Sequence, residues 1–174
     1  MNFLISGLVG NPRAGSKTLA ATRSLVAQCA DVIGATDSGV VDLAEFGGRV
    51  LDQADAEVAD VRARLATVQL LVVATPVYKG SYTGLLKAFL DGYGPGALTS
   101  TFTVPLTIAA SPQHSLAGGT HLQPVLDELG ALSPLGGLFL PDAVAADETQ
   151  RDAAIAEWID RRSAILGAFT AVVA

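Results

Sequence analysis

The amino-acid sequence predicts an α/β protein whose core is a doubly wound, five-stranded parallel sheet with helices on both faces. Short apolar runs alternate with segments of helical periodicity along the chain. The run at residues 70–74 is apolar at every position, which is typical of a strand buried on both faces. We expect the sheet order 2-1-3-4-5, with strands at residues 2–9 (or only 2–6), 40–43, 70–74, 103–110 and 135–140. Helices are expected at residues 17–30, 54–68, 81–91, 120–129 and 147–167.

Composition limits the class of protein. A chain of 174 residues, half of them apolar, is expected to form a single domain spanning residues 1–174 with a large core. The net charge of −6 and the absence of a basic run argue against a nucleic-acid-binding surface. The apolar start lacks the basic segment of a signal peptide, and no stretch is long enough to span a membrane, so a cytoplasmic enzyme is expected.

The first strand leads into a glycine-rich loop at residues 7–16 and then into a helix that Ser16 is expected to cap. Free backbone N–H groups and the positive end of the helix dipole converge on such a turn and favour an anion. Thr18 adds a hydroxyl, and Arg13 and Lys17 add positive charge. The loop is not a Walker P-loop, because Ser16 stands where a glycine is required. A polar turn with an ordinary helix cap remains an alternative.

The next part of the chain is expected to be mainly structural. Residues 31–39 are expected to be a connection and residues 45–52 a loop. The helix at 54–68 places Val58, Val61 and Leu65 toward the core. Its charged residues are expected on solvated faces and not as a pair of catalytic carboxylates; they are Asp55, Glu57, Asp60, Arg62 and Arg64.

The third strand closes at Thr75-Pro76, because proline biases the residue before it to an extended conformation. A loop follows, and then a helix that either Ser81 or Thr83 can cap. Ligands of open α/β sheets bind beyond the carboxyl ends of the strands, which is where this loop lies.

The remaining segments give few chemical signals. His114 and His121 have no carboxylates or cysteines at metal-binding spacing, so no metal site is expected. No nucleophile elbow is present. The single cysteine, Cys29, is expected to be a small apolar side chain on the first helix, and Trp158 is expected in the core or at an interface, not against a flavin.

Residues 74–87, ATPVYKGSYTGLLK, resemble the isoalloxazine loop and following helix of the NADPH-dependent FMN reductases. These flavodoxin-like proteins include the reductase components of two-component alkanesulfonate monooxygenases. The resemblance implies that a set of residues in this loop lies against the flavin ring: Pro76, Val77, Tyr78, Lys79, Gly80 and Ser81.

Two further loops carry the resemblance. The family's phosphate loop has the form Gly-Ser-Pro-Arg followed by serines and threonines, and this chain has Gly-Asn-Pro-Arg at residues 10–13. The resemblance therefore implies that the FMN phosphate is held by Asn11, Pro12, Arg13, Ser16, Lys17 and Thr18. The loop after the fourth strand implies contacts to the ring and pyrimidine end of the flavin from Ser111, Gln113 and His114.

The resemblance implies an NAD(P)H:FMN oxidoreductase. Hydride would pass from C4 of NADPH or NADH to N5 of FMN, with no obligatory protein acid or base and hence no catalytic side chain. Reduced flavin would pass to a monooxygenase or another acceptor, and a homodimer or homotetramer is expected. Alternatives are a flavodoxin-type FMN electron carrier, a quinone, azo or chromate reductase of the same fold, and a sulfate- or nucleotide-binding protein that uses only the first loop.

Reductases that serve two-component monooxygenases often carry an extra aromatic residue in the helix that matches residues 120–129, tied to loose flavin binding. This segment has no tyrosine and shows no obvious extra residue. The sequence therefore leaves open whether FMN is a released substrate or a bound prosthetic group.

Overall fold

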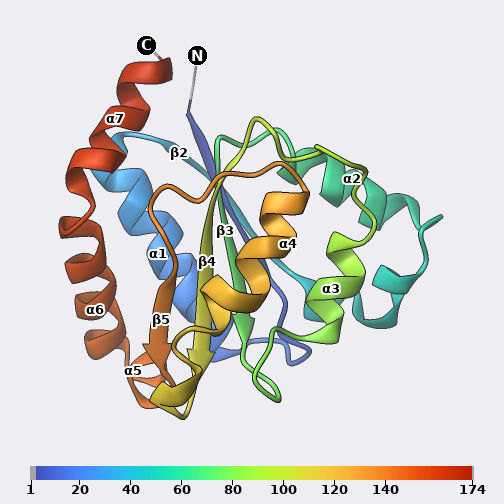
Figure 1. Ribbon diagram of the computed structural model, residues 1–174, viewed down its shortest axis with the longest axis horizontal. Helices are drawn as coiled ribbons and strands as arrows, with labels where there is room; N and C mark the ends of the chain where they lie inside the picture. The colour runs from blue at the N-terminus through green and yellow to red at the C-terminus, as the bar shows by residue number, and fades with distance from the viewer. Residues whose placement is uncertain (1–2, 174) are drawn as a thin grey trace.

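The structure is a computed structural model that describes residues 3–173. Within that range, five parallel strands form one sheet in the order β2-β1-β3-β4-β5, which confirms the predicted order (Figure 1). The strands are β1 (Leu4–Val9), β2 (Thr36–Asp42), β3 (Leu70–Pro76), β4 (Phe102–Ala109) and β5 (Leu138–Pro141). Residue 2, which the sequence placed in the first strand, lies outside the described residues.

Helices cover both faces of the sheet (Figure 1). One face packs against α1 (Lys17–Ile33), α5 (Asp142–Ala146), α6 (Glu148–Asp160) and α7 (Ser163–Val173). The other packs against α2 (Ala56–Leu65), α3 (Gly84–Leu90) and α4 (Gln123–Glu128). Short 3₁₀ segments are η1 (Leu43–Glu45), η2 (Gly47–Leu51) and η3 (Pro112–His114).

The central strand β3 explains why its sequence is apolar at every position. Leu70, Val72 and Ala74 belong to the core cluster on the α1 side, whereas Leu71 and Val73 belong to the cluster on the α2 and α3 side. Side chains of a strand alternate between its faces, so a strand covered on both faces needs apolar residues at all positions. This burial fixes where β3 ends, and therefore where the loop after Pro76 begins.

The second strand is longer than predicted. β2 begins at Thr36, so the expected connection at 31–39 is partly strand, and Leu43 opens a 3₁₀ turn instead of ending the strand. Thr36, Asp37 and Gly39 are exposed because β2 is an edge strand that pairs only with β1 in this sheet. Parallel pairing through the backbone requires no apolar side chains there, so this part of the strand gave no apolar signal.

The C-terminal helix is also broken where one helix was predicted. α6 ends at Asp160 and α7 starts at Ser163. At the break, Nε of Arg162 donates to the carbonyl oxygen of Leu135 at 2.5 Å, and its guanidinium lies 4.3 Å from the Trp158 ring centroid. Trp158 is itself buried, as predicted, and Nε1 of its indole donates to the Gly137 carbonyl oxygen.

The helix after β4 contradicts one sequence expectation. Its first part, η4 (Gly118–Leu122), is a π-helix that continues directly into α4. A π-helical turn holds more residues than an α-helical turn. The sequence predicts an ordinary helix here; the observations that it has no tyrosine and no obvious extra residue stay as they were made.

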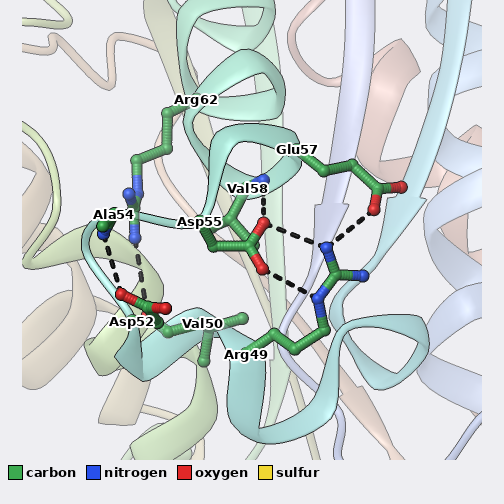
Figure 2. Close-up of polar contacts among 8 residues, drawn as sticks. All are labelled: Arg49, Val50, Asp52, Ala54, Asp55, Glu57, Val58 and Arg62. Carbon is green, nitrogen blue, oxygen red and sulfur yellow. Dashed lines mark hydrogen bonds and ion pairs between the residues drawn. The ribbon is translucent and has the colours of Figure 1, made fainter.

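Arg62 corrects another expectation, because its side chain is buried and not solvated. Only 5% of the residue is exposed, and its guanidinium donates to the carbonyl oxygens of Phe89 at 2.9 Å and Val50 at 3.5 Å. Figure 2 shows Arg62 pointing away from the cluster of Arg49, Asp55 and Glu57. Because Phe89 lies at the C-terminal end of α3, Arg62 ties α2 to the negative end of that helix dipole.

Candidate functional site

Three connecting segments gather at the carboxyl edge of the sheet, at the lower end of the molecule in Figure 1. They are the loop between β1 and α1, the loop between β3 and α3, and the segment after β4. The start of α5, directly after β5, lies at the same edge. This is the edge at which open α/β proteins bind ligands.

A cavity of about 460 Å³ opens between the first two loops. It is lined by Asn11, Arg13, Ala14, Gly15, Ser16, Lys17, Thr18, Pro76, Tyr78, Ile108 and Asp142. Its volume falls in the range of about 300–1,000 Å³ that small-molecule sites occupy. Two segments some sixty residues apart in the chain therefore line one cavity.

Asn11 organises the first loop from inside. Its side chain is buried, and Nδ2 donates to Oγ1 of Thr18 at 3.1 Å while Oδ1 accepts from the Arg13 backbone N–H at 3.0 Å. Ser16 caps α1, as predicted, by accepting from the Leu19 N–H at 3.2 Å. The asparagine that replaces the family's serine thus braces the loop against the first turn of α1, whose N-terminus faces the cavity with its partial positive charge.

Hydrogen bonds of Gly10 join the first loop to β3 and to the residue that caps α3. The Gly10 N–H donates to the Ala74 carbonyl oxygen at 2.7 Å, and the Thr83 hydroxyl donates to the Gly10 carbonyl oxygen. Thr83 also caps α3, so the structure selects it over Ser81 as the cap. Gly10 has to be a glycine, because a Cβ atom there would lie 2.4 Å from Cβ of Leu86 on α3.

The loop after β3 ends in a tight turn. Tyr78 and Ser81 exchange two backbone hydrogen bonds of 2.8 and 3.1 Å, and both residues between them have positive φ, 53° for Lys79 and 84° for Gly80. These angles are typical of a type I′ turn. Lys79 is exposed at its tip, and Tyr78 is 45% exposed at the cavity wall. A lysine in the left-handed region is uncommon and costs about 1 kcal/mol or more, so the turn is a strained feature beside the cavity.

Charged side chains of both signs line the cavity. Arg13 and Lys17 come from the first loop and from α1, and Asp142 comes from the start of α5. Nζ of Lys17 lies 2.6 Å from Oδ2 of Asp142. Among the residues that the structure describes, no group of three or more histidine, cysteine, aspartate or glutamate side chains is placed to hold a metal ion.

Not all of the residues predicted from sequence line this cavity. Those that do are Asn11, Arg13, Ser16, Lys17, Thr18, Pro76 and Tyr78. Those that belong to the same two loops without lining it are Pro12, Val77, Lys79, Gly80 and Ser81. Ser111, Gln113 and His114 form the capped 3₁₀ turn after β4 and do not line it either.

Four lining residues were not among those predicted from the sequence: Ala14 and Gly15, which lie within the predicted first loop, and Ile108 and Asp142, which lie outside the predicted loops. Ile108 was hidden because it reads as an ordinary apolar strand residue. Asp142 follows β5 directly, and the carboxyl ends of parallel strands share one edge, so its position after the fifth apolar run was the available signal. A short helix, α5, carries it, and no helix was predicted there.

The fold and the cavity define a flavodoxin-like α/β protein with a cavity at the carboxyl edge of its sheet. A sequence profile described as NADPH-dependent FMN reductase matches residues 3–146. The chain belongs to this family.

Individual relatives agree with the family assignment. An FMN reductase (NADPH) of Pseudomonas aeruginosa is 31% identical over 146 residues, which cover 81% of this chain and 78% of the relative. An NADH-dependent FMN reductase, SfnE, of Pseudomonas putida is 32% identical over 157 residues, which cover 87% and 84%. The crystal structure of an apo NADH:FMN oxidoreductase, EMOB, superimposes with a TM-score of 0.78 at 27% identity, covering 90% of this chain and 88% of that one.

Within residues 3–173, none of the helices combines the length and the hydropathy that a membrane crossing requires.

Proposed function

We propose that this protein is an NAD(P)H-dependent FMN reductase whose FMN lies in the cavity at the carboxyl edge of the sheet. One observation carries the proposal: a single cavity is lined both by residues of the Arg13–Lys17 segment and by Pro76, at the end of β3, and Tyr78, in the loop that follows it. A phosphate group and a flat aromatic ring are the two ends of FMN, and each end finds suitable side chains there.

The lining residues near the start of α1 suit the phosphate end of FMN. Arg13 and Lys17 supply positive charge, and Ser16 and Thr18 lie in the first turn of α1 or at its cap. Helix N-termini bind phosphate through free N–H groups and the helix dipole. Asn11 keeps this loop in shape through its bonds to Thr18 and Arg13.

The remaining lining residues suit the ring. Pro76, Tyr78 and Ile108 present apolar and aromatic surface to the cavity. Flavin, when bound, accepts a hydride at N5 from the nicotinamide C4. The protein's part is therefore to hold the ring with one side open to the nicotinamide, and no side chain is assigned as a proton donor or acceptor.

We also propose that reduced FMN leaves the protein and serves a monooxygenase or another acceptor. The π-helix at Gly118–Leu122 lies in the helix where the resemblance ties an extra aromatic residue to loose flavin binding, and its wider turn is the feature that supports release, although no aromatic residue stands in this segment. We place the protein in the cytoplasm.

A homodimer or homotetramer is proposed on the basis of an apolar hollow of about 400 Å³ beside α3, where Leu51 is 71% exposed and Leu85 and Ala88 form the wall. Sedimentation velocity tests this directly: a monomer at micromolar concentration contradicts it.

The test of function is an FMN titration followed by anaerobic addition of NADPH or NADH, observed by flavin absorbance. We expect saturable FMN binding and bleaching by at least one nicotinamide. Arg13→Ala should weaken FMN binding about tenfold or more, because a charge-assisted phosphate contact is lost. Arg23→Ala, on the exposed side of α1, is the matched control and should leave it unchanged. Absence of FMN binding contradicts the proposal. FMN binding without bleaching by either nicotinamide favours the alternative, a flavodoxin-type FMN electron carrier.

A further inference from the structure

The cavity contains an ion pair whose two partners come from opposite ends of the chain. Nζ of Lys17 and Oδ2 of Asp142 lie 2.6 Å apart, and their side chains are 40% and 43% exposed. Lys17 is the first residue of α1, and Asp142 is the first residue of α5. Both line the cavity that is assigned to FMN.

Asp142 contributes only modestly to the element that carries it: as an acidic residue in the first turn of α5 it interacts favourably with the helix dipole, by about 0.3–1 kcal/mol. α5 has no side-chain cap, and Lys17 is the one hydrogen-bond partner recorded for the Asp142 carboxylate in the described part of the chain. An exposed ion pair of this kind contributes about 0–1 kcal/mol to folding. The helix dipole and the exposed ion pair together therefore give the fold only a modest gain from a carboxylate at this position.

The negative charge of Asp142 is opposite to that of the other charged groups that line the cavity. Arg13, Lys17 and the N-terminus of α1 all favour an anion, and Asp142 is the single acidic residue among the described residues that line the cavity. A phosphate monoester carries nearly two negative charges at neutral pH. Such a ligand must compete with Asp142 for Lys17, and it also meets the repulsion of the carboxylate.

We propose that Asp142 is an affinity-limiting residue: it competes with the FMN phosphate for Lys17 and so keeps the flavin exchangeable. This inference rests on the proposed function, because it concerns how the same cavity discriminates between flavins. The competition acts on the phosphate alone. A flavin without phosphate, riboflavin, gains nothing when Asp142 is neutralised.

The experiment compares FMN and riboflavin binding by fluorescence quenching in the wild-type protein, in Asp142→Asn and in Asp91→Asn. Asp91 pairs with Lys87 on α3 and does not line the cavity, so Asp91→Asn makes the same change in net charge elsewhere. We expect Asp142→Asn to bind FMN about three- to tenfold more tightly, as for one partly solvated charge interaction, with a slower FMN dissociation rate. Riboflavin affinity should stay within error, and Asp91→Asn should match the wild type for both flavins.

The outcomes separate this inference from the proposed function. Wild-type protein that binds no FMN overturns both. Wild-type protein that binds FMN, with Asp142→Asn equal to it or weaker, overturns the inference alone and makes Asp142 neutral or a productive support for Lys17. An equal gain for FMN and riboflavin also overturns it. Thermal melting of the variants shows whether each is folded, and Asp142→Ala provides a second neutral side chain.

Discussion

The hydroxyl of Thr83, the residue that caps α3, donates a hydrogen bond to the carbonyl oxygen of Gly10 in the loop after β1. The two residues are 73 positions apart, and Thr83 is only 4% exposed. This bond joins the proposed phosphate loop to the proposed ring loop, so that the position of one depends on the position of the other.

Replacing Thr83 with valine removes both the bond to Gly10 and the cap of α3 while keeping the side-chain shape. We expect a loss of about 1–3 kcal/mol in the free energy of unfolding, together with weaker FMN binding. Urea unfolding and FMN titration measure the two effects. Thr83→Ser retains the hydroxyl and should keep most of the FMN affinity. Wild-type FMN affinity in Thr83→Val would show that the hydrogen bond from Thr83 to Gly10 does not affect the site.

Gly10→Ala tests how closely the first loop approaches α3. The added Cβ would lie 2.4 Å from Cβ of Leu86, so the loop or the helix must move, and we expect a loss of about 1–3 kcal/mol in stability. Gly84→Ala is the matched control, because a Cβ there meets nothing within 4 Å and Gly84 opens α3. It should be neutral or stabilising by up to about 1 kcal/mol. Equal melting temperatures for the two variants contradict the close approach.

Arg62→Met tests the buried guanidinium between α2 and α3. The carbonyl oxygens of Phe89 and Val50 lose a donor, so we expect the free energy of unfolding to fall by about 1–3 kcal/mol. Arg64→Met, on the exposed face of the same helix, should change it by no more than about 0.5 kcal/mol. If Arg62→Met and Arg64→Met have equal free energies of unfolding, the buried hydrogen bonds of Arg62 do not stabilise the fold.

Asp55 gives a prediction about pH. Hydrogen bonds from the Arg49 side chain and then from the Val58 N–H lower the pKa of the Asp55 carboxyl below its ordinary 3.8 (Figure 2). A pKa lowered by folding stabilises the native state above the unfolded-state pKa, and the stabilisation is lost as pH falls through the native-state pKa. Asp55→Asn should therefore be less stable than wild type at pH 6, and the difference should shrink below pH 3.8. A difference that stays constant in urea unfolding down to pH 2.5 contradicts this.

The parts that were predictable from sequence are those where one local pattern decides the structure. The apolar run of β3 has a single physical explanation, burial on both faces, and its position fixed the loop at Pro76 and Tyr78. The serine before Lys17 marks the start of α1 by cap chemistry alone. Together these patterns predict the two chain segments that line most of the cavity.

The parts that were not predictable depend on contacts between distant segments. Arg62 has the composition of a solvated helix residue, and only the approach of Phe89 explains its burial. Asp142 enters the cavity because β5 is placed beside β4, and the π-helix at Gly118–Leu122 has no distinctive residue type. The turn after β4 remains a prediction from resemblance, since its residues do not reach the cavity described here.

The most direct measurement of the central claim is the electron density of crystals grown with FMN. We predict that the flavin phosphate lies at the start of α1, between Arg13 and Lys17, and that the ring lies against Pro76 and Tyr78. Flavin density at any other edge of the sheet, or phosphate and ring ends in reversed positions, contradicts the assignment of this cavity.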